Sequence, residues 1–400
     1  MAAARNAIAI TAAAIACMLW ACGGPGAAPA PGPSQPPAGS QIDRIIASTY
    51  PGDMGVELAI FKNSTLVYEH SYGLRDRGLP DVFFGQNFWN IEQPDKLFNL
   101  TRGRFAPDDN TSFDLASVSK EFTAGAILLL QQDGKLSVND SLAKYFPTLP
   151  NAGAITLQEL LHHSSGLVEY NTFGGNPDFS GAYAQFMADG QTNYQPIVDT
   201  LGTYPLDFPP GSQFEYSNTN YLLLGMIVAR VSGEPLGDFL KQRIFGPLGM
   251  KQTSQGYPPA PVTDLALGYR STPGVDYRIF QWNLQWLAGP GGLTSTVGDV
   301  EKWDEAVRRP GIFTQRTLTQ MFSPGPFPQS YGTYADGWFI ATLQGHPYVW
   351  HDGAVGGFVT MNATFPQDGL DIIILVNDGN GEDPYYAIPQ IFPIALGLHA

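Results

Sequence analysis

Ser117 and Lys120 are the residues whose types and spacing could do chemistry, since they lie three apart in the segment FDLASVSKEFTAGAILLLQQDG (113–134). Residues three apart share one face of a helix, so the Lys120 amine can reach Ser117 Oγ. The start of a helix also offers unpaired N–H groups and positive potential to an oxyanion. The pair therefore predicts a serine nucleophile with a base beside it.

Lys120 can accept a proton near neutral pH only if its pKa falls from about 10.4 to roughly 7–8, which burial can achieve. The run AILLL (126–130) makes the following helix apolar almost all round, as in a helix buried within a large domain, and Gly134 ends it. Ser-x-x-Lys is a weak motif alone, because Ser141 and Lys144 share its spacing. Those two lie in a polar turn, where we expect a structural pair.

Tyr216 and Asn218 form a second polar pair in the segment FEYSN (214–218), just before an apolar helix expected over 221–231. Side chains two apart in an extended segment point the same way, so a phenol and an amide can enter one cleft together. A third segment, YVWHDGA (348–354), is expected to be a strand and carries His351.

The adjacent histidines His162 and His163 invite interpretation as metal ligands. Neighbouring residues diverge on a helix, however, and the other histidines show no ligand spacing. We therefore expect no metal and a hydrogen-bonded, structural His163.

The remaining pattern predicts the elements that must position these residues. Apolar periodicity predicts helices over 41–50, 155–161, 235–245 (ending at 246–247) and 296–307, and a glycine-rich turn over 289–295. A hairpin over 55–75, with one face on a core, and strands over 348–354, 359–365 and 370–376 predict an antiparallel sheet. Two irregular segments, 76–110 and 173–203, could form a lid, a rim or packed loop, with one helix over 182–189.

The N-terminal residues 1–22 have the pattern of an export leader: a charged Arg5, an apolar stretch over 7–19 too short to span a bilayer, and LWAC (19–22). This predicts a lipoprotein with Cys22 lipidated, with ordinary secretion as the alternative. Residues 23–40 are a Pro, Gly and Ala-rich linker. Cysteine occurs only at 17 and 22, which excludes disulfides from the mature chain. The net charge of −15 argues against nucleic acid and anionic lipid surfaces as partners.

The three motifs, in this order, resemble the penicillin-recognising serine hydrolases, in the branch of class C β-lactamases, D-aminopeptidases, D-alanyl-D-alanine carboxypeptidases and β-lactamase-like esterases. The resemblance runs from residue 41 to the C-terminus and includes LHHSSGL (161–167) and GLTST (292–296). It implies an α/β (α+β) fold without cofactor: an antiparallel sheet flanked by helices, with an inserted, mainly helical lobe. The helical lobe would cover about 118–270, and the sheet lobe 41–117 and 271–400.

The resemblance also implies a role for each motif residue. Ser117 would attack a carbonyl, Lys120 and Tyr216 would share the proton transfers, and Asn218 would hold the substrate's amide or ester side chain. The N–H groups of Ser117 and Ala354 would form the oxyanion hole. The strand with His351, Gly353 and Ala354 would pair alongside the substrate.

His351 departs from the lysine that the family's β-lactamases carry at this position. Histidine is mostly neutral at pH 7, so the requirement for a substrate carboxylate weakens. This favours an exported cell-envelope hydrolase acting on ester or D-amino-acid amide or peptide substrates. A β-lactamase or D,D-carboxypeptidase remains an alternative, as does a non-catalytic receptor for cell-wall peptides. The only membrane contact expected is the lipid at Cys22.

Overall fold

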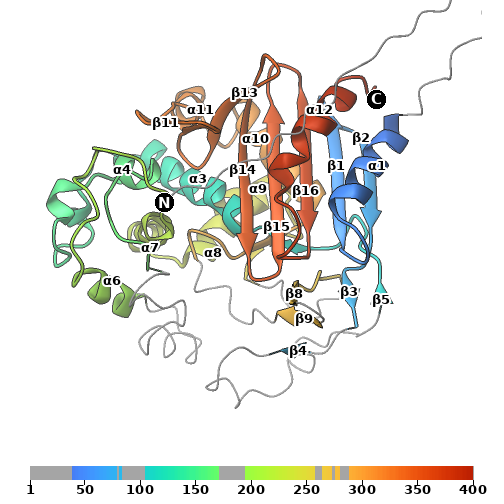
Figure 1. The fold of residues 1–400 in the computed structure, drawn as a ribbon. Helices are drawn as coiled ribbons and strands as arrows, with labels where there is room; N and C mark the ends of the chain where they lie inside the picture. Colours follow the sequence, from blue (N-terminus) through green and yellow to red (C-terminus); the bar gives the residue numbers. More distant parts are fainter. Residues whose placement is uncertain are drawn as a thin grey trace, which may run out of the picture. The chain divides into compact units, whose positions relative to one another are not determined.

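Figure 1 shows the fold as a computed structural model, which describes residues 38–78, 81–82, 104–170, 194–256, 264–272, 275–279 and 288–399. All of these residues belong to one compact unit, 37–400. The predicted leader, the lipidation site Cys22, most of the linker, the helix over 182–189 and most of the segment 76–110 lie outside the described residues. Within the described part of the chain, no helix is both long and apolar enough to cross a membrane.

An antiparallel sheet of eight strands, ordered β11-β12-β13-β14-β15-β16-β1-β2, forms the centre of this unit. The N-terminal strand β1 pairs with the C-terminal strand β16, so the sheet joins both ends of the fold (Figure 1). The three strands predicted near the C-terminus are confirmed as β14, β15 and β16. The strands are β1 (Val56–Lys62), β2 (Thr65–Tyr72), β11 (Pro328–Gln329), β12 (Gly332–Tyr334), β13 (Phe339–Leu343), β14 (His346–Val355), β15 (Phe358–Phe365) and β16 (Leu370–Val376).

The predicted hairpin is confirmed as β1 and β2, which a two-residue turn connects. Asn63 and Ser64 both have positive φ, 49° and 62°, as the right-handed twist of such a tight hairpin requires. The expectation of one buried face is wrong for β1, which is buried along almost its whole length. The reason is its place inside the sheet, between β16 and β2, with helices on both faces.

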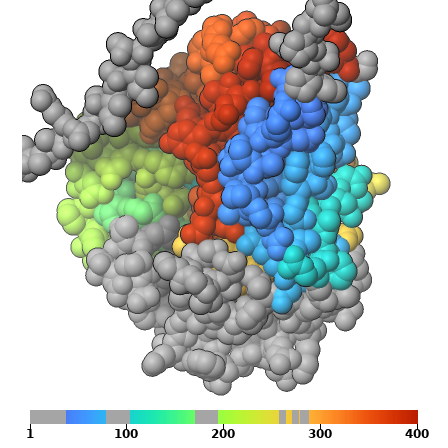
Figure 2. Space-filling view, turned by 45° about the vertical axis from the view of Figure 1, so that its right-hand side comes forward, coloured from blue at the N-terminus to red at the C-terminus, as the bar shows by residue number. Residues whose placement is uncertain are grey.

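Helices cover the two faces of the sheet. α1 (Ala38–Thr49) and α12 (Ile388–Ala395) contact each other on one face, and α10 (Val297–Arg308) packs on the other (Figure 1). Figure 2 shows the surface of α1 beside that of the C-terminal segments. The predicted start of α10 is confirmed: the Thr296 side chain accepts a hydrogen bond from the Asp299 N–H and so caps the helix.

Besides α10, the segment between β2 and β11 carries most of the other helices, and these lie on the side of the sheet next to β13 and β14 (Figure 1). α3 is its centre: every residue from Ser119 to Leu130 is buried, and α7 and α11 pack against it. The predicted fold class is therefore confirmed. These helices are α3 (Ser119–Gln132), α4 (Leu157–Leu161), α6 (Gln195–Leu201), α7 (Asn218–Ser232), α8 (Leu236–Leu240), α9 (Gly246–Leu248) and α11 (Gln315–Met321).

Two predicted boundaries are wrong. The helix expected to end at 246–247 continues through a π-helical turn, η5 (Lys241–Phe245), into α9 and ends at Gly249. A π turn widens the helix, so the proline ring at Pro247 and its missing N–H can be accommodated. Part of the predicted turn 289–295 is a strand, β10 (Leu293–Ser295), because it pairs with β6 (Phe113–Asp114) and β7 (Ser254–Gln255).

Short elements complete the described fold. They include two further small sheets, β3 with β5, and β4 with β9 and β8. Their bounds are β3 (Asp76–Arg77), β4 (Asp81–Val82), β5 (Arg104–Phe105), β8 (Tyr269–Thr272) and β9 (Val275–Ile279), with short 3-10 helices η1 (Ala116–Val118), η2 (Leu142–Lys144), η3 (Ala152–Ala154) and η7 (Pro384–Tyr386).

Candidate active site

Ser117 lies in the 3-10 turn η1, immediately before α3 rather than inside it. The residue before it, Ala116, has a φ of 48°, a left-handed conformation that costs an alanine energy. The Asp114 carboxylate accepts the Ala116 N–H at 2.8 Å, and the Leu293 carbonyl accepts the Leu115 N–H at 2.8 Å. Contacts on both sides therefore hold the turn that presents the Ser117 hydroxyl.

Lys120 is fully buried, and its Nζ lies 2.9 Å from Ser117 Oγ, 2.8 Å from Asn218 Oδ1 and 2.7 Å from the Pro290 carbonyl. Burial lowers the pKa of Lys120 from 10.5 to about 7, against the opposing charges of nearby carboxylates. A neutral amine has two N–H donors and one lone pair. It can therefore donate to Asn218 and Pro290 while its lone pair accepts the Ser117 O–H, which is the geometry of a base on a nucleophile.

Tyr216 flanks the same amine, with its ring centre 4.8 Å from Lys120 Nζ. Burial raises the pKa of Tyr216 well above 10, and the neighbouring Ser117 hydroxyl opposes that shift. The phenol therefore keeps its proton at neutral pH. The phenol can pass a proton from the Lys120 amine to a leaving group without becoming charged itself.

Asn218 is the first residue of α7, and Glu169 holds it in place. The Glu169 carboxylate accepts the Asn218 backbone N–H, and Asn218 Nδ2 lies 3.4 Å from Glu169 Oε1. Sequence analysis missed both Glu169 and Pro290. Glu169 stands two residues beyond the LHHSSGL segment, which is the one signal that could have indicated it. The Pro290 carbonyl belongs to the backbone and leaves no signal in residue type.

His163 lies beneath Tyr216, with the two ring centres 4.3 Å apart. It is fully buried at a φ of 54°, and its Nδ1 accepts the Ser217 N–H at 3.2 Å. Burial lowers the pKa of His163 well below 6.5, and the charge of Lys120 adds to that effect. The predicted structural role of His163 is confirmed: it is a neutral support for the tyrosine loop.

His162 points elsewhere, as expected for adjacent residues at a helix end. Its Nε2 lies 3.0 Å from Asp336 Oδ1. The second Ser-x-x-Lys pair is also structural, as predicted. Ser141 caps η2, and Lys144 forms a half-exposed ion pair with Asp140 at 2.8 Å.

Strand β14 runs past the nucleophile turn with part of one edge unpaired. β13 pairs with residues 346–350 only, so no described strand continues beside 351–355 on that side. We call residues 351–355 the free edge. Gly353 contacts the nucleophile turn so closely that a Cβ there would lie 2.6 Å from the Leu115 carbonyl and 2.4 Å from Thr360 Oγ1. Gly353 thus lets the strand approach Ser117, while Ala354 beside it is exposed.

His351 is only 1% exposed and lies inside the molecule. The Tyr334 hydroxyl donates to its Nε2 at 3.0 Å, and its Nδ1–H donates to the Asp352 carbonyl at 2.6 Å. Burial lowers the pKa of His351 to about 3, and the charge of Lys120 adds to that effect. The ring is therefore neutral, and a substrate at this edge would meet backbone groups rather than the His351 side chain.

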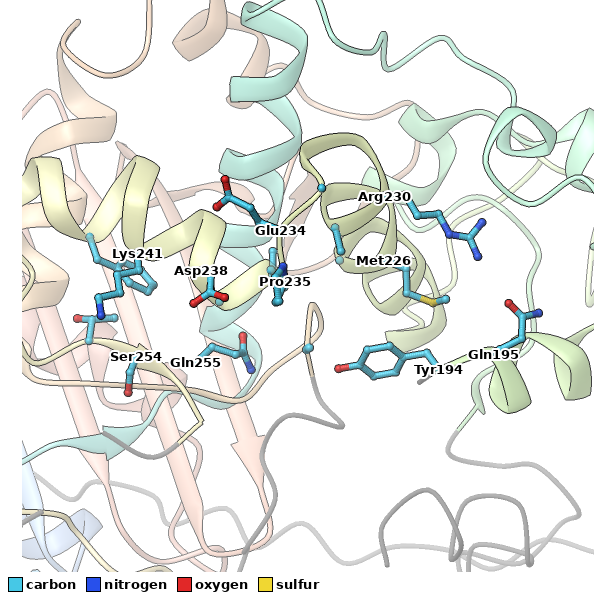
Figure 3. Close-up of a pocket in the computed structure, with 18 of the residues that line it drawn as sticks. Tyr194, Gln195, Met226, Arg230, Glu234, Pro235, Asp238, Lys241, Ser254 and Gln255 are labelled. Carbon is cyan, nitrogen blue, oxygen red and sulfur yellow. The ribbon is translucent and has the colours of Figure 1, made fainter. Parts of the chain in front are cut away.

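Two other features lie apart from these residues. Among the described residues, Glu301, Asp304 and Asp371 bring carboxylate oxygens within 4.8 Å of one another, as in a cation site, but Arg308 already pairs with Glu301 and Asp371. A pocket of about 730 Å³ lies along α7 and α8, with Met226 and Tyr194 at one end and Lys241 and Ser254 at the other (Figure 3). None of Ser117, Lys120 and Tyr216 lines it, so it is not part of the candidate active site.

Comparison with known proteins gives consistent matches. A family model described as Beta-lactamase matches residues 50–395. A penicillin-binding protein of Bacillus subtilis (strain 168) is 31% identical over 316 residues, 74% of this chain and 66% of that protein, so the match spans just under two thirds of the relative. The solved structure of D-amino acid amidase from Ochrobactrum anthropi SV3, complexed with D-phenylalanine, is 25% identical with a TM-score of 0.71 over 89% of this chain and 98% of that chain.

Proposed function

The chain belongs to the β-lactamase family, and from this premise we propose that it is a serine hydrolase that forms an acyl-enzyme on Ser117. The observation that carries the proposal is the buried Lys120 amine, 2.9 Å from Ser117 Oγ, with a pKa lowered to about 7. A base with that pKa is neutral for a large fraction of molecules at pH 7. It can therefore activate the hydroxyl without a metal or cofactor.

In this scheme Lys120 takes the Ser117 proton as Oγ attacks the substrate carbonyl. The oxyanion would accept hydrogen bonds from the N–H groups of Ser117 and Ala354. Loss of one such donor typically costs ~3–4 kcal/mol in the transition state. The proton then passes through Lys120 and Tyr216 to the leaving group. A water molecule, deprotonated by the same groups, then attacks the acyl carbonyl. The bond to Ser117 Oγ breaks, the acid product leaves, and the proton returns to Ser117 Oγ.

The proposed substrates are esters or D-amino-acid amides and peptides, with Asn218 holding the acyl side chain. Two observations support this choice over β-lactams: His351 is neutral, and a D-amino acid amidase is among the similar structures. A β-lactamase or D,D-carboxypeptidase activity is the second candidate, because the chain is similar to a penicillin-binding protein. Three assays distinguish these activities. Hydrolysis of nitrocefin reports a β-lactamase, release of D-alanine from a D-alanyl peptide reports a D,D-carboxypeptidase, and cleavage of a D-amino-acid amide reports the activity proposed first.

The test of the proposed function uses p-nitrophenyl butyrate with wild type, Ser117→Ala and Ser141→Ala. Ser141 is the matched control, since it also has a lysine three residues later but has a structural role: it caps η2 and donates to the Ala152 carbonyl at 3.0 Å. We expect Ser117→Ala to lower kcat/KM by at least about a thousandfold, and Ser141→Ala to change it little. Equal rates for wild type and Ser117→Ala would exclude Ser117 as nucleophile, and a wild type in which a fluorophosphonate leaves Ser117 unlabelled would favour the non-catalytic receptor.

We also propose that the chain is exported and lipid-anchored through Cys22, with residues 23–40 as a spacer. The support is the leader pattern over 1–22, in which Cys17 and Cys22 are the two cysteines of the chain. Palmitate labelling should be lost in Cys22→Ser and kept in Cys17→Ser. Absence of label in the wild type would leave ordinary secretion.

A further inference from the structure

Thr123 carries a buried hydroxyl inside the apolar helix α3, one turn after Lys120. A threonine within a helix commonly returns its proton to the carbonyl four residues earlier. Here that carbonyl, of Ser119, is 3.5 Å from Thr123 Oγ1, whereas the Gly289 carbonyl is only 2.8 Å away. A hydroxyl has one proton to donate, so Thr123 donates it out of its own helix to the segment 288–293.

The segment 288–293 contacts both α3 and α7. On the α3 side, besides the hydrogen bond to Gly289, Ser119 Oγ accepts the Leu293 N–H at 3.1 Å. On the α7 side, a Cβ at Gly289 would lie 2.1 Å from the Tyr221 carbonyl, and Gly289 has a φ of 116°. The chain therefore needs glycine at this position, and the two helices together set the position of the segment's backbone.

This backbone supplies one of the acceptors of the catalytic amine. The residue after Gly289 is Pro290, whose carbonyl accepts a hydrogen bond from Lys120 Nζ at 2.7 Å. Asn218 Oδ1 accepts a second one at 2.8 Å, so both N–H groups of the neutral amine are engaged and its lone pair is left for Ser117 Oγ. If the Pro290 carbonyl moved, the amine could rotate, and its lone pair would no longer be directed at the hydroxyl.

We propose that Thr123 is a positioning residue of this hydrolase: it holds the Gly289 carbonyl, and so keeps the next carbonyl, that of Pro290, on the Lys120 amine. Valine has the same branched shape as threonine, so packing in α3 does not by itself require a hydroxyl here. This inference rests on the proposed function, because the orientation of Lys120 affects the rate only if this amine is the base of Ser117.

The Pro290 carbonyl also affects the pKa of Lys120. An oxygen that accepts a hydrogen bond from the amine favours its protonated form, so loss of this contact should lower the pKa of Lys120. A change at Thr123 leaves the other titratable groups around the amine unaltered. These groups are Glu169 and Asp352, whose charges raise the pKa of Lys120, the neutral His163 and His351, and the phenols Tyr216 and Tyr221.

The test measures kcat/KM for p-nitrophenyl butyrate between pH 5.5 and 9 in wild type, Thr123→Val, Thr123→Ala and Thr123→Ser. Thr317→Val is the matched control. Thr317 is also a buried threonine, and its hydroxyl donates to Gln132 Oε1 at 2.7 Å, at the far end of α3. The control variant therefore loses a similar hydrogen bond to the same helix without changing a contact of the segment 288–293.

We expect Thr123→Val and Thr123→Ala to lower the plateau of kcat/KM at high pH by about ten- to a hundredfold, as a small misplacement of a catalytic group does. The rising limb, over which Lys120 loses its proton, should move to lower pH by roughly half a unit to one unit, because the ammonium loses a hydrogen bond. Thr123→Ser keeps the hydroxyl and should keep a rate and a limb close to those of the wild type. Thr317→Val should leave the limb unchanged.

Several outcomes would overturn the inference. An unchanged rate and limb in both variants without the hydroxyl, or a limb that moves to higher pH, contradicts it and leaves the proposed function standing. A fall in rate with an unmoved limb, or failure of both variants to fold, would make Thr123 a structural residue. The same fall and shift in Thr317→Val would assign the effect to stability. A wild type without Ser117-dependent hydrolysis would overturn the proposed function and the inference together.

Discussion

Lys120 connects the packing of α3 with the chemistry of Ser117, because the burial that stabilises the helix also lowers the pKa of its amine. The amine must be neutral to accept the Ser117 proton. Protonation below its pKa would remove the lone pair and leave an ammonium that only donates. The structure therefore makes a prediction about pH.

We expect kcat/KM for a neutral ester to rise with pH through an apparent pKa of about 7, the value for Lys120 in the folded protein, and to level off above it. Stopped assays between pH 5.5 and 9 with p-nitrophenyl butyrate measure this. In Asp352→Asn the rising limb should move to lower pH, because Asp352 raises the pKa of Lys120. A rate that falls with pH, or that does not change, contradicts the role of Lys120 as base.

At the residue scale, spacing beside apolar helices could pair Ser117 with Lys120 and Tyr216 with Asn218, and the resemblance to a known family implied that the two pairs share one site. The structure adds the left-handed conformation of Ala116. Its hydrogen bond to Asp114 and the hydrogen bond of the neighbouring Leu115 to β10 hold that strained conformation. Such a conformation cannot be inferred from an alanine, since alanine normally avoids positive φ. The same holds for the Pro290 carbonyl, which any residue could supply.

At the scale of elements, the site depends on how closely β14 passes the nucleophile turn. Gly353 sets that distance, since a Cβ there would lie under 3 Å from the Leu115 carbonyl, Thr360 Oγ1 and Ala116 Cβ. Backbone and short side chains cannot move aside as a long side chain can. The strand and the turn would have to separate.

Gly353→Ala should therefore lower ester hydrolysis by about a hundredfold, because the oxyanion donor on β14 moves away from Ser117, and should destabilise the fold by roughly 1–3 kcal/mol. Gly298→Ala is the control: that glycine lies in α10 with no atom within 4 Å of its Cβ position. It should leave the rate and the melting temperature nearly unchanged. Wild-type activity in Gly353→Ala would show that the strand does not supply the oxyanion donor.

The five longest strands of the central sheet and helices such as α3 and α7 could be predicted because their apolar periodicity agrees with their final environment. β14, β15 and β16 are examples, and tight turns join them. The shorter strands β11, β12 and β13 and the helices α6, α11 and α12 were not predicted. The free edge could not be predicted, because it depends on where β13 stops pairing rather than on β14 itself. The π-turn before Pro247 is similar, since a local breaker signal was overridden by the helix that continues around it.

At the scale of the whole molecule, four carboxylates are buried between α3, α10 and the sheet: Glu121, Glu301, Asp304 and Asp371. Arg308 pairs with two of them, and Asn362 donates to Asp304 at 2.8 Å. Burial raises the pKa values of all four above those of exposed carboxyls, and repulsion by neighbouring carboxylates adds to that effect for Glu301 and Asp304. The folded protein therefore holds protons that the unfolded chain releases.

The sign of the pH effect follows. A carboxyl with a raised folded pKa contributes stability that is complete below its unfolded pKa of about 4.5 and is lost as pH rises towards the folded pKa, by at most about 1.4 kcal/mol per pH unit. His163 and His351, with lowered pKa values, act in the opposite sense below 6.5. The contribution of one carboxyl is therefore measured as the difference between a variant and the wild type in how the melting temperature changes with pH.

Glu301→Gln replaces one buried carboxyl by a neutral group of the same shape. We expect its melting temperature to fall less between pH 5 and pH 8 than that of the wild type, by scanning calorimetry. Glu305→Gln, on the same helix in an exposed pair with Arg309, should follow the wild type. An identical pH dependence in wild type and Glu301→Gln would mean that Glu301 titrates normally.

The most direct test of the account is the site of covalent labelling. Mature protein treated with a fluorophosphonate at pH 8 and analysed by peptide mass spectrometry should carry one label, on Ser117, in the wild type and in Ser141→Ala. Lys120→Arg, which keeps a basic side chain that cannot lose its proton, should label far more slowly. A label on another residue, or an unlabelled Ser117 in active protein, would contradict the claim that Ser117 and Lys120 are the nucleophile and its base.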